Sequence, residues 1–456
     1  MRVLKFGGTS VADAAAISRV VAIVARRSGP RTVVVSALAG VTDALLQTAE
    51  LATRDPLAAH AGVDALAARH KAVAAPFRTE GTRHALDSAL DGIACGAVST
   101  VRAIAASGRS PALVDRLLAC GELWSSRIVS AAFAAAGVPV QWFDARHVLR
   151  TDDRHGEAAP DLAATDKAVT RLVRPALALD RVVVLGGFVG TAPDGATTTL
   201  GRGGSDYSAA VLGACLLADE IEIWTDVDGV FTADPRLVPG ARVLPALSYE
   251  DAETLATFGA KVLHPKTIEP AASREIPVRV LNSNRPAAPG TRIDGSGADA
   301  RGYTAVTSRG GLCLLEFTAR ERPAPAGFGA RVLQSLEDAR VGIFVGEVHR
   351  DRVSVAVDGA FDARTLRAQV EAFAEMRSRN GLSAVCAVGD RLATDPTALA
   401  GALALFQEGP IHLVARPGGA TAFAVVVDDH HAHTIVARLH ASFVAETVEA
   451  REEMAS

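Results

Sequence analysis

Residues 197 to 206, Thr-Thr-Thr-Leu-Gly-Arg-Gly-Gly-Ser-Asp, form the most informative stretch of this sequence. Three hydroxyl residues lead into a turn that holds three glycines and Arg202, and a helix is expected to open at Ser205. Glycine lets the backbone approach a ligand closely, and a helix N-terminus presents unpaired N–H groups to an anion. Arginine binds planar carboxylates or phosphates through paired hydrogen bonds. The segment therefore predicts an anion site. A polar surface turn is the alternative, which the buried-looking strand Val182 to Leu185 just before it disfavours.

A second glycine turn follows an apolar strand at the amino end. Lys5 and Phe6 end this strand, Gly7 and Gly8 follow, and a helical pattern begins near Ala12. The spacing is not that of a Walker A motif, but it has the same parts: a lysine at a strand end, backbone donors and a helix start. A surface lysine is the alternative, although a lysine on an apolar strand needs a charged partner.

Two further segments add positive charge. A strand runs through Ile221 to Trp224 into a turn that extends to Arg236, and Phe258 to Pro265 contains Lys261. In an α/β sheet, ligands bind at the carboxyl ends of the strands. Lys5, Arg202, Arg236 and Lys261 at such loop ends predict a polyphosphate ligand.

Four motifs resemble those of the aspartate kinases, and the resemblance covers the whole chain. They are Lys-Phe-Gly-Gly-Thr-Ser from residue 5, Thr-Thr-Thr-Leu-Gly-Arg-Gly-Gly-Ser-Asp from 197, Trp-Thr-Asp-Val-Asp-Gly-Val-Phe-Thr-Ala-Asp-Pro-Arg from 224 and Phe-Gly-Ala-Lys-Val-Leu-His-Pro from 258. Gln141 to Asp144 and Arg150 to Arg154 resemble the single-function, lysine-sensitive type most.

The composition bounds the class of protein. At 456 residues the chain is long enough for about three domains, and a net charge of −4 argues against a nucleic-acid or anionic-membrane partner. Five scattered cysteines without a CxxC pair indicate reduced thiols. A strand that begins at Val3 leaves no room for a signal peptide, and no run of membrane-helix length is expected, so a cytoplasmic location is predicted.

The order of strand and helix patterns predicts the fold class. Strands near the amino end alternate with helical stretches at 57–107 and 113–135, which indicates an α/β fold with a doubly wound, mainly parallel sheet. Loop-like composition near 285–302 marks a boundary. The resemblance implies an amino-acid kinase domain over 1–295. It also implies two ACT-like βαββαβ modules, over 303–384 and 385–456, with the C-terminal segment as a candidate to return to the first module.

The resemblance also implies a reaction and roles for residues. The reaction is ATP-dependent phosphorylation of the L-aspartate β-carboxylate to 4-phospho-L-aspartate, the first step of lysine, threonine and methionine biosynthesis. The residues expected to be catalytic are Lys5, Asp206 and Lys261, and those expected to bind the substrate are Thr42, Glu122, Arg202 and Ser205. The residues expected to bind ATP are Lys5, Phe6, Gly7, Gly8, Thr225, Asp226, Phe231, Arg236, Lys261 and Val262.

Several of these roles have plain structural alternatives. Glu122, expected to face the substrate ammonium, could be a helix-surface glutamate, and Thr42 could be only a helix cap. Asp206 could orient the lysines, cap its helix, or do both. Phe231 stands where relatives often carry tyrosine, so a hydroxyl contact would be lost. His264 is expected to be structural.

Cofactors and partners follow from the same resemblance. Mg²⁺ is expected to bridge the ATP phosphates, without a dedicated cluster of protein ligands. The run from Asp428 to His433 is read as a solvated turn and helix start in preference to a metal site. An amino-acid effector at the ACT-like modules and a homo-oligomer, a dimer or tetramer, are also expected.

The regulatory region departs from the lysine-sensitive pattern. Such forms usually have a methionine and a serine near a loop that here reads from Glu321 to Phe328, and an aspartate near the position of Phe344. Pro323 and Pro325 remove two backbone donors from that loop. Two other functions stay open at this point: another amino-acid kinase, and a catalytically silent amino-acid sensor on the same scaffold. A substrate panel would decide the first, and loss of the charged residues would favour the second.

Overall fold

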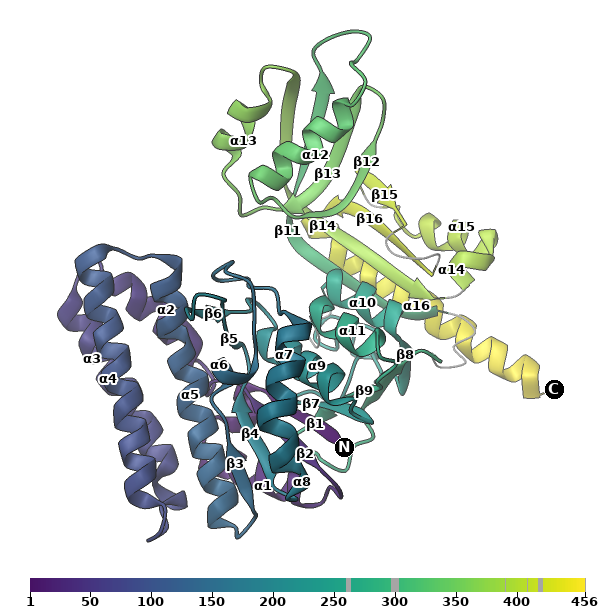
Figure 1. The fold of residues 1–456 in the computed structure, drawn as a ribbon. Coiled ribbons are helices and arrows are strands. Elements are labelled where there is room, and N and C mark those ends of the chain that lie inside the picture. The colour runs from purple at the N-terminus through teal and green to yellow at the C-terminus, as the bar shows by residue number, and fades with distance from the viewer. Residues whose placement is uncertain (260–263, 297–302, 390, 408, 417–420, 456) are drawn as a thin grey trace. The chain divides into compact units, whose positions relative to one another are not determined.

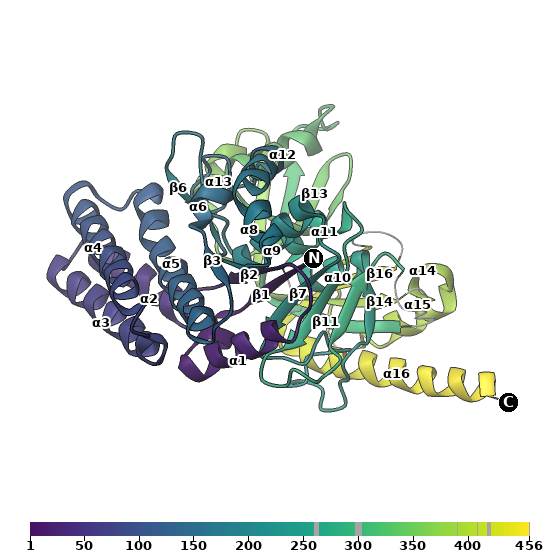
Figure 2. The same ribbon diagram turned by 60° about the horizontal axis from the view of Figure 1, so that its bottom comes forward.

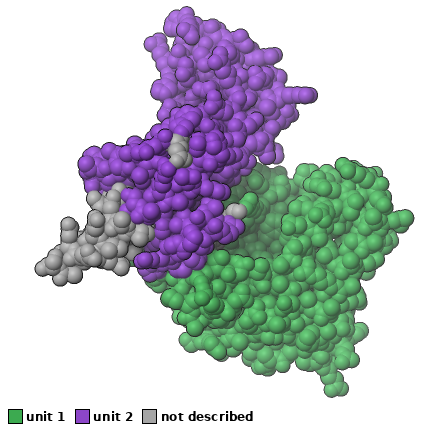
Figure 3. Space-filling model, turned by 180° about the vertical axis from the view of Figure 1, so that it is seen from behind, with its two compact units in different colours: residues 1–230, 262–296 green, residues 231–261, 297–456 purple. Residues whose placement is uncertain are grey.

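The structure is a computed structural model that describes residues 1–455 except 260–263, 297–302, 390, 408 and 417–420. The chain forms two compact units, which Figure 3 shows in separate colours. The first unit comprises 1–230 and 262–296, and the second comprises 231–261 and 297–456. Each unit is described by itself below.

The first unit is built on a largely parallel sheet (Figure 1). Its strands follow the spatial order β3-β4-β2-β1-β7-β9-β10. All neighbours in this order are parallel except β9 and β10. The strands are β1 (Arg2–Phe6), β2 (Arg31–Val35), β3 (Val140–Trp142), β4 (Val182–Gly186), β7 (Glu220–Thr225), β9 (Val278–Asn282) and β10 (Thr291–Asp294). Valine-rich strands such as β2 and β4 are buried along almost their whole length, as expected when helices cover both faces of a parallel sheet.

Successive side chains of a strand point to opposite faces of the sheet. Because apolar side chains therefore lie on both faces of this sheet, helices cover both. Leu4, Val33 and Val184 belong to one core with α1 (Ala14–Ala25) and α5 (Pro111–Ala135). The alternate side chains face α9 (Gly204–Leu216), which packs against β1, β2 and β7. The doubly wound, mainly parallel arrangement predicted from the sequence is confirmed.

Among the described residues, the first unit also contains seven further α-helices and a small β-hairpin. The helices are α2 (Val41–Leu51), α3 (Pro56–Ala74), α4 (Arg83–Ser107), α6 (Ala145–Val148), α7 (Leu162–Ala168), α8 (Arg174–Ala178) and α11 (Pro265–Ala272). Short 3₁₀ turns span Gly8–Val11 and Ala75–Phe77, and a π-helical turn spans Val169–Val173. The hairpin pairs β5 (Val189–Thr191) with β6 (Thr197–Thr199), so the hydroxyl residues of the glycine turn form a strand.

One helix corrects an expectation about membrane segments. By length and composition alone, α4 could cross a membrane, whereas the sequence predicted no run of that length. Its buried residues, among them Leu86, Leu90 and Val101, join the main core, and α4 packs against α3 and α5. Only 28% of its most apolar window is buried within the structure, and length and composition alone are weak evidence for a membrane span.

The second unit contains a six-stranded antiparallel sheet of order β12-β13-β11-β14-β16-β15. Its strands are β11 (Tyr303–Ala319), β12 (Ile343–Val348), β13 (Arg352–Asp358), β14 (Ala374–Gly389), β15 (Leu413–Ala415) and β16 (Ala422–Asp428). Its helices are α10 (Tyr249–Thr257), α12 (Phe328–Asp338), α13 (Ala363–Val370), α14 (Arg391–Thr394), α15 (Pro396–Ala404) and α16 (Asp429–Ala455), and the short strand β8 spans Ala246–Ser248. Figures 1 and 2 both show α16 beside β11 and β14, with which it packs.

The two central strands of this sheet are longer than the sequence predicted. The patterns indicated strands at 312–317 and 385–388, whereas β11 and β14 pair from one end of the sheet to the other. The half that carries α12 and α13 has one hydrophobic core, and the half that carries α16 has another. Two modules are thus present, as predicted, but they share their central strands.

Candidate functional site

A cavity of about 630 Å³ lies in the first unit, at the carboxyl ends of β1, β2 and β4. Chain segments far apart in sequence line it. They contribute Lys5, Ser36, Thr42, Asp115, Glu122, Phe188, Thr199, Arg202, Ser205 and Asp206, among others. The cavity thus brings together all four predicted substrate-binding residues and two of the three predicted catalytic ones.

Lys5 and Asp206 form an ion pair across this cavity. The Lys5 Nζ lies 2.5 Å from the Asp206 Oδ1, and the lysine is only 8% exposed. A buried ammonium is tolerated when a carboxylate pairs with it, so the position of Lys5 on an apolar strand is explained. The N-cap of α9 is Gly203, without a side-chain cap. Asp206 therefore holds Lys5 and does not cap its helix.

Glycine is required where the loops that line the cavity approach other segments. A Cβ on Gly8 would lie 2.9 Å from the Ala37 carbonyl oxygen, and a Cβ on Gly203 would overlap the His264 side chain. Gly203 also has a φ of 71°, in the left-handed region that favours glycine. His264 caps α11 through its Nδ1, which accepts from the Lys266 N–H, and burial lowers its pKa. These contacts fit the structural role expected for His264.

Glu122 lies inside the protein, on the face of α5 that meets the end of β4. Gly186 makes this possible, because a Cβ there would lie 2.8 Å from the Cβ of Glu122. The Oε1 of Glu122 accepts from the Ala37 N–H at 3.1 Å, while its Oε2 is buried without a hydrogen-bond partner among the described residues. Burial raises the pKa of Glu122 to about 8, an effect that the hydrogen bond from the Ala37 N–H and, less strongly, the positive charge of Lys5 only partly offset. The helix-surface alternative for Glu122 is wrong, since the residue is 3% exposed.

Asp115, about two turns before Glu122 on the same face of α5, is a residue that the sequence did not reveal. Its Oδ1 accepts from the Thr199 hydroxyl at 2.6 Å, and its Oδ2 accepts from the Gly156 and Thr199 N–H groups. The His155 Nδ1 lies 2.9 Å from the same Oδ2. Asp115 is 1% exposed and ties β6 and the 152–157 loop to α5, so it fixes the entry into the glycine turn. A single acidic residue in a helical pattern gives no local signal of this kind.

Phe188 is a second such residue, just after β4. It lines the cavity with a φ of 64°, which is uncommon for an aromatic residue. Its N–H donates to the Ser208 hydroxyl of α9, and that hydroxyl donates to the Gly204 carbonyl. Backbone strain of this kind concentrates at functional sites. The preceding Gly186-Gly187 pair was the available signal, because a Cβ on Gly187 would lie 2.7 Å from Ser205.

The remaining predicted substrate residues lie around the same cavity. Thr42 is in the first turn of α2, whose N-cap is Gly40, so Thr42 is not the cap. Ser205 is buried in the first turn of α9, and Arg202 is exposed at the edge of the cavity. One buried carboxylate with a free oxygen, a helix N-terminus and a guanidinium are complementary to a small zwitterion.

The predicted ATP-binding residues are more dispersed. Gly7 lies beside the Lys5 ammonium and donates its N–H to the Trp224 carbonyl, while Thr225 and Asp226 follow at the end of β7. The Phe6 side chain is fully buried and stacked on Trp224, so only its backbone is available to a nucleotide.

Four predicted nucleotide residues lie outside the first unit or outside the described residues. Phe231 and Arg236 belong to the second unit, where Arg236 is exposed and pairs with Asp234 at 2.6 Å. Lys261 and Val262 lie outside the described residues.

Phe344, in the second unit, has a cationic neighbour. It lies in β12 at a bulge between Ile343 and Val345, and the Arg309 guanidinium stacks 3.9 Å from its ring centroid. Glu347, the carboxylate nearest to it along the strand, is exposed.

Comparison with known proteins identifies the family. Residues 1–282 match the model of the amino acid kinase family. The chain is 33% identical over 451 residues to the lysine-sensitive aspartokinase 3 of Escherichia coli K12, and the matched region covers 96% of this chain and 98% of that protein. It is also 33% identical over 405 residues to the bifunctional aspartokinase/homoserine dehydrogenase 2 of the same organism. That match covers 86% of this chain and 48% of the bifunctional protein, so the chain spans about half of its length.

Solved structures agree with this similarity. The structure of E. coli aspartokinase III in complex with aspartate and ADP, in the R-state, superposes with a TM-score of 0.88 at 32% identity, covering 97% of this chain and 99% of that one. The complex of the same enzyme with lysine and aspartate, in the T-state, gives a TM-score of 0.78 at 31% identity, with the same coverage. With the motifs, the fold and these similarities together, the chain belongs to the amino acid kinase family and, within it, to the aspartate kinases.

Proposed function

We propose that the cavity of the first unit binds L-aspartate for phosphorylation by ATP, with the substrate ammonium on Glu122 and a substrate carboxylate on Arg202. The observation that carries this proposal is the buried Oε2 of Glu122, which has no partner among the described residues and lies in the same cavity as Arg202 and Ser205. A buried carboxylate oxygen without a partner is costly, and a substrate ammonium would satisfy it.

The chemistry needs charge and orientation more than it needs a base. The β-carboxylate of aspartate is already ionised at neutral pH. One of its oxygens forms a bond to the γ-phosphorus, the bond from that phosphorus to the β–γ bridging oxygen breaks, and ADP leaves. Lys5, held by Asp206, neutralises the charge that develops on the transferring phosphoryl group, and the N–H groups at the start of α9 orient the anions.

The nucleotide side of the site rests on resemblance more than on geometry. We assign ATP contacts to the Lys5-Phe6-Gly7-Gly8 segment, with Phe6 acting through its backbone, and to Thr225 and Asp226. Phe231, Arg236, Lys261 and Val262 keep the same assignment from the family motifs. Among the described residues, the cavity holds no group of three metal-ligating side chains. We therefore infer that magnesium enters as part of the MgATP substrate.

Residues 303–456, in the second unit, are the proposed regulatory part. The domain boundaries proposed from the sequence are 1–295 for the kinase and 303–384 and 385–456 for the ACT-like modules. The lysine complex of the E. coli relative supports an amino-acid effector in this region. A homo-oligomer, a dimer or tetramer, and a cytoplasmic location complete the proposal.

An ADP-release assay with MgATP tests this function, with aspartate, glutamate, N-acetyl-aspartate and no acceptor in parallel. Trapping of the product with hydroxylamine reports the acyl phosphate directly. We expect turnover with aspartate, little with glutamate and loss with N-acetyl-aspartate, whose amine carries no charge for Glu122. A silent sensor would bind aspartate without releasing ADP, and another amino-acid kinase would prefer a different acceptor.

A further inference from the structure

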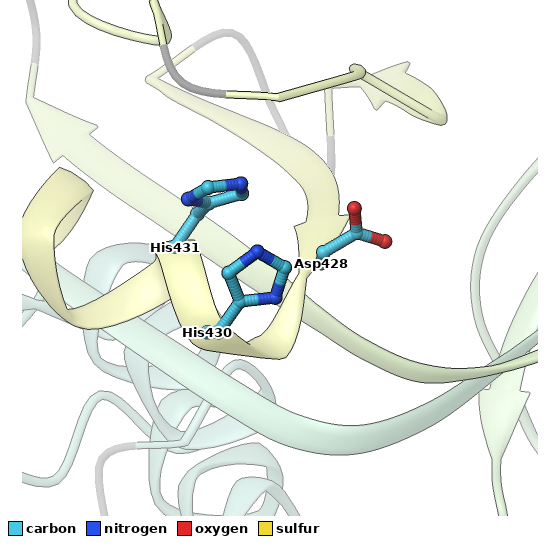
Figure 4. Close-up of side chains that lie close together, drawn as sticks. All are labelled: Asp428, His430 and His431. Atoms are coloured by element: carbon cyan, nitrogen blue, oxygen red, sulfur yellow. The ribbon is translucent and has the colours of Figure 1, made fainter.

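A group of potential metal ligands lies in the second unit, where β16 ends and α16 begins. Asp428 is the last residue of β16, and His430 and His431 are in the first turn of α16. One ligand atom from each residue lies within 4.8 Å of those of the other two (Figure 4). Asp428 and His431 are half-buried and His430 is exposed, so an ion could reach the group from solvent.

The neighbouring strand supplies a residue that orients the carboxylate. His412 directly precedes β15, and its backbone N–H donates to the Val426 carbonyl of β16. Its Nε2 lies 3.0 Å from the Asp428 Oδ1, and its side chain is only 9% exposed. Metal-binding carboxylates are typically held by hydrogen bonds of this kind. Sequence spacing could not reveal this contact, since 16 residues separate the two.

The loop before β15 also positions one of the imidazoles. Gly409 has a φ of 79°, and a Cβ on it would lie 2.7 Å from the His431 ring. The His430 and His431 ring centroids are 3.9 Å apart. The backbone of the loop therefore packs against His431 and helps to hold the two rings side by side.

We propose that Asp428, His430 and His431 bind one divalent transition-metal ion, zinc above all, with water as a further ligand and His412 as the hydrogen-bond support of Asp428. Two imidazole nitrogens and one carboxylate oxygen suit zinc, whereas magnesium and calcium prefer oxygen ligands. Atoms that bind zinc at about 2.0–2.2 Å lie closer to one another than 4.8 Å, the distance within which the ligand atoms of these three residues lie here. Rotation of the exposed His430 side chain can bring them together.

A bound ion would join elements that the chain leaves separate. It would connect the end of β16 to the first turn of α16 and, through the contact between His412 and Asp428, to the edge strand β15. An ion that binds only the folded form raises stability in proportion to its free concentration. The bound ion would therefore stabilise the half of the second unit that carries α16.

Titration of the tag-free, full-length protein with zinc tests the proposal. The protein is first treated with chelator and dialysed. Isothermal calorimetry should show one zinc ion per chain, and Co²⁺ should give the visible absorption of a nitrogen–oxygen site. The double substitution His430→Ala/His431→Ala should weaken binding at least 100-fold. His412→Ala should weaken it about 10- to 100-fold, as loss of a supporting residue does.

His433→Ala is the matched control, because His433 is exposed on the same helix and outside the group. It should bind zinc as the original protein does, and excess Mg²⁺ should not displace the ion. Asp428→Asn, which keeps the shape of the side chain, gives a second variant whose fold can be checked by circular dichroism. Binding that is equal in the original protein and in the folded double or Asp428→Asn variant would overturn the proposal, as would the absence of binding at up to 100 µM zinc, roughly the range of weak surface sites.

Discussion

The proposed contact between Glu122 and the substrate ammonium predicts that the binding of aspartate depends on pH. In the unliganded protein burial raises its pKa to about 8, so at pH 7 about 0.9 of the molecules hold a neutral carboxylic acid there. A substrate ammonium needs the ionised form. We therefore expect aspartate binding at pH 7 to release about 0.9 proton per site, and about 0.5 at pH 8.

The affinity should follow the same linkage. Below pH 8 each pH unit should strengthen aspartate binding about tenfold, and the gain should level off above pH 8. Isothermal calorimetry at pH 7 in buffers of different ionisation enthalpy measures the released protons. Glu122→Gln keeps the shape and cannot ionise, so it should bind aspartate weakly, release no proton, and bind MgATP normally.

The stability of the unliganded protein provides an independent measurement. At about 1.4 kcal/mol per pH unit, a rise from 4.5 to about 8 makes the ionised form less stable by at most about 5 kcal/mol. Between pH 4.5 and 8 the folded protein keeps a proton on Glu122 that the unfolded chain loses. The free energy of unfolding is therefore highest below pH 4.5 and falls as the pH rises towards 8. Glu122→Gln should lack that fall. If the original protein released no proton on binding aspartate, or if the variant showed the same fall in stability, the reasoning would be refuted.

Three further variants and one ligand test the rest of the proposal. Lys5→Ala should lower kcat about 10²–10³-fold, the usual loss for a group that stabilises transition-state charge. Arg202→Ala should mainly raise the KM for aspartate. Steady-state kinetics at saturating MgATP measure both, and near-normal values would contradict these roles. Asp115→Asn replaces an acceptor of backbone N–H groups by an amide, at a cost of about 1–3 kcal/mol in the free energy of unfolding. The variant should have a Tm lower by several degrees and a higher KM for aspartate, with little change in the KM for ATP. An unchanged KM for aspartate would contradict a positioning role for Asp115. Lysine should inhibit weakly, because the Phe344 ring offers no carboxylate to an ammonium and the nearby Asp358 is already paired with Arg309 at 3.1 Å. A titration at sub-saturating aspartate, with threonine and methionine in parallel, checks this, and strong inhibition at micromolar lysine would contradict it.

Local patterns predicted most of the elements well. The helix expected at 113–135 and the strand expected at 182–185 agree with α5 and β4 to within a residue or two, because apolar periodicity and helix caps act over a few residues. The lengths of β11 and β14 were underestimated, since pairing with distant strands extends a strand beyond its own apolar run.

The sequence by itself determined the chemistry of the site: glycines where the backbone must turn or approach closely, Lys5 at a strand end, and Arg202 before a helix start. These signals are local, because they depend on backbone geometry and on charge within a few residues. Only the tertiary structure decided that Glu122 is buried with one oxygen unpartnered and that Asp115 fixes the β6 strand. It also placed His412 beside Asp428. Burial and contacts between distant segments are properties of the packed chain, and a residue read in its own neighbourhood carries no record of them.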